Sequence, residues 1–284
     1  MPDLKPMAFG EVLDGSLTIF RRNFSLFVKL GVVALWLPVA MTIYVSLAGG
    51  QQQHLGLSFL ANVIQYFAGL FLSASAIRVI SDAYLGHEPQ FTEAISFGSS
   101  KIWSLFVAGL AKGVIVGGIA ILIGIVAAVT IPSLARGGGS GSAALVLILA
   151  IAVGGWFLTF VACGYAVTTP VVVLENLASA TDSLGRSWAL TKGAKLRIFG
   201  IFFVAGLIVF LPMVLVGGLA GILKPESLIS GQAFEVIAAA LPIILTPLLS
   251  CVITLVYYDL RVRREGFDLQ VLSEQLSTMG TGAY

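Results

Sequence analysis

Charged residues are scarce in this sequence, and their scarcity sets the physical class of the protein. Asp, Glu, Lys and Arg make up 11% of the 284 residues, against about 25% in an ordinary soluble domain. Residues of the set AVILMFWYC account for 58%, and 32 glycines come in addition. A water-soluble surface cannot be built from this composition. A soluble globular enzyme is therefore excluded, and so is a disordered chain, which needs low hydrophobicity and high charge.

Cysteine, histidine and an excess of one charge are scarce as well. Cys163 and Cys251 lie in separate apolar stretches and are interpreted as small buried hydrophobic residues, without metal spacing or a disulfide framework. The formal net charge of +2 gives no sign of a nucleic-acid partner. HExxH, GxSxG, Walker A, Rossmann and paired intramembrane aspartate motifs are all missing from the sequence. We expect no catalytic residue, no metal, no cofactor and no enzymatic activity.

Six long apolar runs predict an all-α integral membrane protein. A helix needs about 20 apolar residues to cross a hydrocarbon core of about 30 Å, and none of the runs has the alternating pattern of a β-barrel strand. The predicted transmembrane helices are Leu26–Ala48, Ser58–Ile77, Gly113–Ala135, Ala143–Leu174, Ile198–Leu223 and Val236–Tyr258.

The polar segments between these runs predict the orientation in the membrane. Fourteen of the 16 Lys and Arg residues fall on the side of the N-terminus, and only Arg136 and Lys224 fall on the other. Cytoplasmic loops carry an excess of basic residues, so we expect both termini in the cytoplasm. His54 and His87 are then on opposite sides of the membrane and cannot share a metal site.

The cytoplasmic segments also indicate a threefold repeat. The second, fourth and sixth spans end near Asp82, Glu175 and Asp259, and each acid is followed six or seven residues later by another. Short amphipathic stretches precede the other three spans, around residues 9, 91 and 177, and are expected to be interfacial helices. The predicted repeats, each an interfacial helix plus a transmembrane hairpin, are 7–88, 89–176 and 177–268. They form one membrane domain, 1–268, followed by a short cytoplasmic tail, 269–284.

The three acids at the inner face, Asp82, Glu175 and Asp259, are interpreted as structural. A carboxylate at the start of an interfacial helix complements the helix dipole and caps free amides, and Ser179 with Asp182 has the spacing of a capping box. Alternatively, the three acids pair with basic residues of neighbouring repeats and tie the units into a ring at the inner surface.

Basic residues beside the spans are the candidate lipid headgroup-binding residues. Each exposed Lys or Arg near an anionic membrane surface contributes about 1 kcal/mol of attraction, although plain positive-inside topology explains the same charges. The expected partners are the bilayer, an anionic lipid and an unidentified membrane protein. The candidates are Arg21, Arg22, Lys192, Lys195, Arg197, Arg261, Arg263 and Arg264.

Three stretches together resemble a known family: FGEVLD at Phe9–Asp14, RSWALTKG at Arg186–Gly193 and YYDLRVRREGFDL at Tyr257–Leu269. They are similar to the membrane domain of glycerophosphoryl diester phosphodiesterases and its stand-alone bacterial relatives, over nearly the whole chain. In fused members a separate barrel of about 200 or more residues carries the catalytic residues, and this chain has no room for one. The resemblance implies a helical module of a bacterial cytoplasmic membrane that anchors, partners or presents substrate to another protein.

These observations favour a non-enzymatic polytopic membrane protein that acts as an assembly or lipid-associated module. The alternative is a transporter or channel, favoured by internal repeats, prolines within spans and glycine-rich helices. Gly109, Gly113 and Gly117 form two GxxxG steps, which predict close helix contacts within the chain or between chains. Apart from Ser and Thr, Asn62 and Gln65 are almost the only strongly polar side chains well inside a span. A transported substrate would therefore be hydrophobic or lipid-like.

Overall fold

The computed structural model describes residues 5–48, 54–136, 141–222, 240–267 and 269, and within these residues all regular secondary structure is helical. Six helices in this part of the chain are long and apolar enough to cross a membrane. The predicted class is thereby confirmed: the chain is an all-helical, multi-pass membrane protein. The spans are Phe24–Val45, Leu55–Tyr84, Phe91–Val129, Ile151–Leu174, Lys195–Pro212 and Pro242–Glu265.

The first described helix has the amphipathic character that its sequence predicts. Val12, Ser16 and Phe20 are buried along one face, and Glu11 in the first turn complements the helix dipole. The helices in chain order are α1 (Phe9–Arg22), α2 (Phe24–Leu47), α3 (Leu55–Tyr84), α4 (Phe91–Arg136), α5 (Gly141–Gly164), α6 (Thr168–Leu174), α7 (Asp182–Thr191), α8 (Lys195–Ile222) and α10 (Pro242–Glu265).

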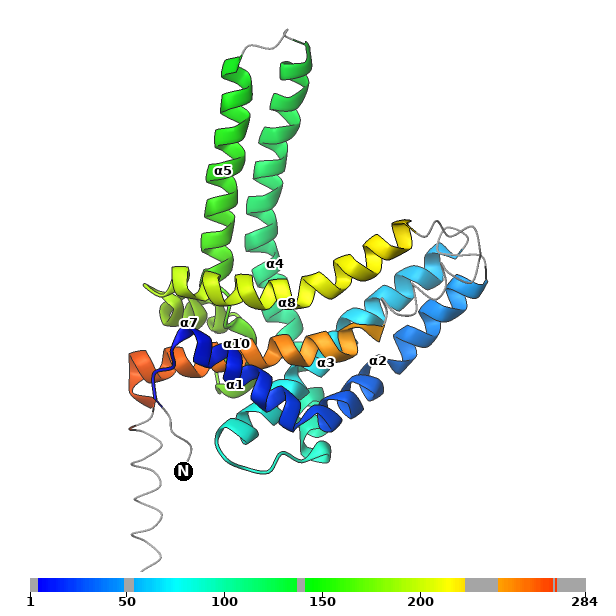
Figure 1. The fold of residues 1–284 in the computed structure, drawn as a ribbon, viewed down its shortest axis with the longest axis vertical. Coiled ribbons are helices and arrows are strands. Elements are labelled where there is room, and N and C mark those ends of the chain that lie inside the picture. Colours follow the sequence, from blue (N-terminus) through cyan, green and yellow to red (C-terminus); the bar gives the residue numbers. More distant parts are fainter. Residues whose placement is uncertain (1–4, 49–53, 137–140, 223–239, 268, 270–284) are drawn as a thin grey trace, which may run out of the picture.

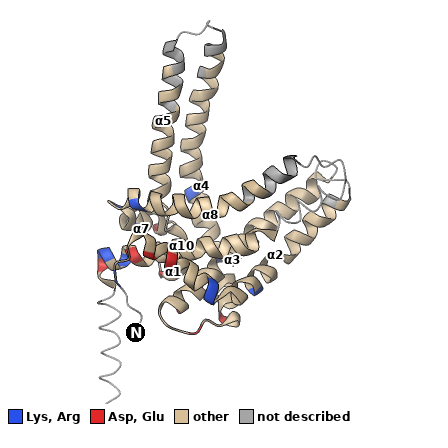
Figure 2. Cartoon of the chain, viewed as in Figure 1, with Lys and Arg blue, Asp and Glu red and all other residues tan. Residues whose placement is uncertain are grey.

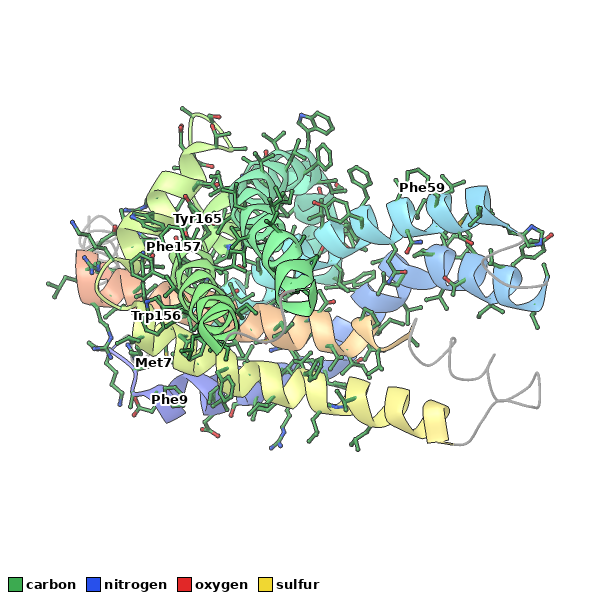
Figure 3. All side chains as sticks on the ribbon, turned by 90° about the horizontal axis from the view of Figure 1, so that it is seen from above. Met7, Phe9, Phe59, Trp156, Phe157 and Tyr165 are labelled. Carbon is green, nitrogen blue, oxygen red and sulfur yellow. The ribbon has the colours of Figure 1, made fainter. Side chains whose placement is uncertain are left out.

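The helices form two arms that diverge from a common base (Figure 1). The α4–α5 hairpin stands apart from the arm that contains α2, α3, α8 and α10, and the view from above shows the hairpin nearly end-on while the other arm lies flat (Figure 3). With 46 residues, α4 is about 70 Å long at about 1.5 Å per residue. In the most apolar 18-residue segment of α4, no residue is buried inside the protein. This part of the hairpin therefore exposes its side chains to the membrane.

Helix α10 is the centre of the larger arm. It packs against α1, α2 and α3, with Leu255 and Tyr257 fully buried on one side and Cys251 on another. Because lipid chains are as apolar as Leu, helix association in a membrane depends on packing and polar contacts rather than on the hydrophobic effect. Tyr258 supplies both, since its ring stacks on Tyr84 at 4.8 Å and its hydroxyl is 2.7 Å from that of Ser81.

The second amphipathic stretch differs from its prediction. It does not form a separate interfacial helix but is the first part of the continuous helix α4. In the first unit Asn23 leaves the helical conformation between α1 and α2, and in the third Gly193 adopts a left-handed φ of 78° between α7 and α8. In the second unit no residue between Phe91 and Arg136 leaves the helical conformation, so the amphipathic stretch and the span form one helix. The threefold repeat stays a prediction, as do the domain bounds.

Two further sequence expectations are corrected. The predicted span Ala143–Leu174 is interrupted after Gly164, and a short helix, α6, resumes at Thr168. The break fits Pro170, which has no amide hydrogen for a helical bond to the carbonyl four residues earlier. Gly113 and Gly117 make no close helix contact within the chain, because a Cβ atom added at either glycine would meet no atom within 4 Å; a contact between chains stays a prediction.

Candidate functional site

Charged side chains gather where α7, the start of α8 and the end of α10 meet, at the left of Figure 2, and we call this region the charged end. At its centre the Asp259 carboxylate, 3% exposed, accepts hydrogen bonds from Arg197 at 2.5 Å and Arg263 at 3.0 Å. It also accepts one from the Met7 amide at 2.8 Å, while both guanidinium groups donate to the Met7 carbonyl. This junction joins the chain before α1 to α8 and α10.

A second junction of the charged end is built around Arg186 on α7. Its Nε donates to Glu175 at 2.8 Å, and its two terminal nitrogens contact both carboxylate oxygens of Glu265 at 2.5 and 2.9 Å. Tyr257 donates its hydroxyl hydrogen to the other oxygen of Glu175 at 3.0 Å. The hydrogen bonds to Glu265 and Glu175 raise the pKa of Arg186 above its ordinary value, so the guanidinium stays charged.

The third acid of the predicted set, Asp82, makes its ion pair within its own helix. Its carboxylate is 3.1 Å from Nε of Arg78, one turn earlier in α3. Glu175 forms an ion pair with Arg186 of the following predicted repeat. Among the described residues, Asp82 forms no ion pair with a residue of another repeat. The three acids therefore make different kinds of contact.

The capping contact predicted for Asp182 is confirmed, since its carboxylate accepts a hydrogen bond from the Ser179 amide at 3.0 Å.

The eight candidate headgroup residues separate into three groups. Arg197, Arg261 and Arg263 are engaged by carboxylates. Arg21 and Arg22 lie at the far end of α1, about 20 Å along the helix from its start. The remaining three lie at the charged end, and within the described residues they form no ion pair. These three residues are Lys192, Lys195 and Arg264.

Lys195 is held between two aromatic rings. Its ammonium lies 3.4 Å from the ring centroids of both Phe160 and Trp188, a cation–π arrangement. The Trp188 ring lies directly against Gly164, where any Cβ atom would overlap it. Hydroxyl groups of Ser187 and Thr191 donate to the Gly164 carbonyl at 3.0 and 3.1 Å. The end of α5 is thereby fastened to α7, and the rings are fixed in place.

An apolar groove of about 420 Å³ runs between α5 and α8 beside Lys195. Figure 3 shows Trp156 on the side of α5 that faces α8. A second hollow of about 640 Å³ continues past Lys195 toward Lys192 and Gly193, and Phe160, Lys195 and Leu196 line both. The groove is lined by Ala152, Gly155, Trp156, Thr159, Phe160, Cys163, Lys195, Leu196 and Phe199.

Sequence reasoning included Lys195 among the candidates but missed the aromatic residues around it. Phe160 and Trp188 come from different helices, and they meet only because α7 folds back onto the end of α5. A lysine at a span boundary and a tryptophan in the preceding amphipathic stretch were the available signals, since both prefer membrane interfaces. Neither signal indicates that the two side chains touch.

Comparison with known proteins assigns no function to this geometry. No protein-family model, curated protein or solved structure matches the chain. Across the described ranges, no group of three or more His, Cys, Asp or Glu residues could hold a metal ion. The chemistry available at the charged end is that of cationic groups beside an apolar surface.

Proposed function

We propose that the chain is a non-enzymatic multi-pass protein of a bacterial cytoplasmic membrane, with both termini in the cytoplasm, that acts as an assembly or lipid-associated module. The observation that carries the proposal is the division of the basic side chains at the charged end. Arg197 and Arg263 share the carboxylate of Asp259 as ion-pair partner, whereas Lys192, Lys195 and Arg264 form no ion pair within the described residues. Unpaired cations at a membrane surface attract anionic headgroups.

A relationship to the membrane domain of glycerophosphoryl diester phosphodiesterases is part of the same proposal. Its support is that the three resembling stretches meet in space. Arg186 of the second stretch pairs with Glu265 of the third, and Arg263 of the third donates to the Met7 carbonyl, just before the first. Stretches far apart in the sequence thus build one unit, which also favours treating 1–268 as a single domain.

Native mass spectrometry of the full chain in mild detergent tests the lipid association. The variant Lys192→Gln/Lys195→Gln/Arg264→Gln is compared with the wild type, after both are equilibrated with phosphatidylglycerol and phosphatidylcholine. The wild type should retain phosphatidylglycerol, and the triple variant should retain at least fivefold less. Lys29→Gln/Lys101→Gln, which removes basic residues elsewhere, is the matched control and should behave as the wild type. Equal retention by all three proteins would contradict lipid association.

A transporter of a hydrophobic or lipid-like substrate is the second candidate function. The groove between α5 and α8 favours it, because its lining is almost entirely apolar and includes large exposed side chains such as Trp156 and Phe199. Asn62 donates its side-chain amide to the Ser58 carbonyl of its own helix at 2.8 Å, which leaves little polar lining for a hydrophilic solute. Movement of fluorescent phospholipid between leaflets of reconstituted vesicles would support transport. A stoichiometric protein in the native spectrum would support an assembly role.

A further inference from the structure

We infer that the groove between α5 and α8 binds one anionic phospholipid, with an acyl chain along the groove and the phosphate at Lys195 and Lys192. The inference rests on the proposed lipid association and gives it a single site. The groove and the adjoining hollow have volumes of about 420 and 640 Å³, within the range of about 300–1,000 Å³ that is usual for ligand sites. The two spaces share Lys195, so one amphiphile can occupy both.

The apolar part of the site has the chemistry of an acyl-chain groove. Trp156 and Phe199 contribute large apolar surfaces from opposite helices and are 64% and 44% exposed. The hydroxyl of Thr159, which also lines the groove, donates to the Gly155 carbonyl at 2.8 Å. The Thr159 hydroxyl hydrogen is thus already bonded within α5, and the groove needs no polar ligand group at this position. Gly155 leaves space in the wall, since a Cβ atom there would meet no atom within 4 Å.

The polar part of the site begins at Lys195. The rings of Phe160 and Trp188 hold its ammonium in place but accept no conventional hydrogen bond, and no described residue accepts one from it. An ammonium has three donors, and charge-assisted hydrogen bonds to phosphate oxygens are about twice as strong as neutral ones. The ammonium is thus positioned for an anion that the described part of the protein does not supply.

The turn between α7 and α8 brings a second cation to the same hollow. Gly193 adopts a left-handed φ of 78°, which lets the chain reverse between Lys192 and Lys195, and all three residues line the hollow. Arg197, two residues further along α8, lies about 200° around the helix from Lys195, where it pairs with Asp259 at 2.5 Å. The phosphate is therefore expected at the two lysines and not at the neighbouring arginine.

The test uses two single variants of the full chain in detergent micelles that contain phosphatidylglycerol and phosphatidylcholine. The retained lipid is counted by native mass spectrometry. Gly155→Leu fills the groove and leaves every charge in place. Lys195→Gln removes the cation and leaves the groove open. Their matched controls are Gly118→Leu, at another glycine with free space around it, and Lys101→Gln. Thermal unfolding of all four variants verifies that they fold.

We expect the wild type and both controls to retain one phosphatidylglycerol in preference to phosphatidylcholine. Both Gly155→Leu and Lys195→Gln should retain at least tenfold less. Retention by Gly155→Leu equal to that of Gly118→Leu would overturn the groove as the acyl-chain site. Equal retention of the two lipids by the wild type would overturn the preference for a headgroup with net negative charge, since both lipids carry a phosphate.

The same measurements separate this inference from the proposed function. If both single variants retain the lipid while Lys192→Gln/Lys195→Gln/Arg264→Gln loses it, the groove site is wrong and lipid association at the charged end stands. If the triple variant also retains the lipid, both are wrong. If Lys195→Gln fails to fold, Gly155→Leu alone tests the groove. Lys195→Arg, which keeps the charge, should then retain the lipid.

Discussion

Arg186 and Glu265 are joined by two contacts, from the two terminal guanidinium nitrogens to the two carboxylate oxygens, at 2.5 and 2.9 Å. This bidentate geometry fixes orientation as well as distance. It ties the amphipathic helix α7 to the end of α10, the helix at the centre of the larger arm. The charged end is therefore held together by specific ion pairs and is more than a solvated rim of the membrane domain.

Removal of the Arg186 guanidinium should destabilise the charged end. In Arg186→Gln the carboxylates of Glu175 and Glu265 are left close together without their shared partner. The expected loss is about 1–3 kcal/mol, between the values for exposed and buried pairs. Arg186→Lys keeps the charge but not the bidentate geometry and should lose less. Thermal unfolding in detergent measures both, and a melting temperature of Arg186→Gln equal to that of Arg264→Gln would count against the prediction.

The contribution of Arg186 should not change with pH across the neutral range. Its pKa is raised by hydrogen bonds to Glu265 and Glu175, so its stabilising effect is fully present below its ordinary pKa and is lost only at strongly alkaline pH. The gap in melting temperature between the wild type and Arg186→Gln should be the same at about pH 7 and about pH 9. A gap that shrinks over this interval would show that another group titrates at the junction.

The acids at the ends of the even-numbered spans should differ in their effect on stability. Asp259→Asn leaves Arg197 and Arg263 without their buried carboxylate, and breaking a buried pair costs about 3–5 kcal/mol. Asp82→Asn breaks a pair within one helix whose arginine is 37% exposed, and should cost about 0–1 kcal/mol. The yield of folded protein and its melting temperature should fall steeply for Asp259→Asn alone. Similar values for both variants would contradict the distinction.

Substitution of two glycines in α5 should have opposite effects. In Gly164→Ala the new methyl group overlaps the Trp188 ring, and such overpacking costs about 1–3 kcal/mol. Gly155→Ala has free space and should be neutral or stabilise the helix by up to about 1 kcal/mol. Thermal unfolding followed by tryptophan fluorescence compares the two. If Gly164→Ala is as stable as Gly155→Ala, Trp188 does not pack on this glycine.

The orientation can be tested by labelling single cysteines in intact cells. Cys163 and Cys251 are buried and are first replaced by Ala. Gln52→Cys should then react with a membrane-impermeant thiol reagent, because residue 52 is predicted on the outer side. Ser99→Cys, which is exposed and predicted on the cytoplasmic side, should react only after the cells are opened. The reverse pattern would place the termini outside.

The spans could be predicted from the sequence because the cost of placing polar groups in lipid acts locally, on each run of residues. Helix α1 was predicted for the same kind of reason, since its periodicity is contained in 14 residues. The ion pair of Arg186 with Glu265 and the rings around Lys195 depend on contacts between distant segments. The continuity of α4 was missed because an amphipathic start does not by itself end a helix, and the interruption after Gly164 because the apolar run continues through it.

The divergence of the two arms has a mechanical consequence for the membrane. Helices that diverge from a common base cannot all lie along the bilayer normal, so at least one arm must tilt, and a tilted helix adapts to bilayer thickness by changing its angle. Helix α4, about 70 Å long, has ample length for a steep tilt. A bilayer of different thickness would therefore require a different tilt of α4.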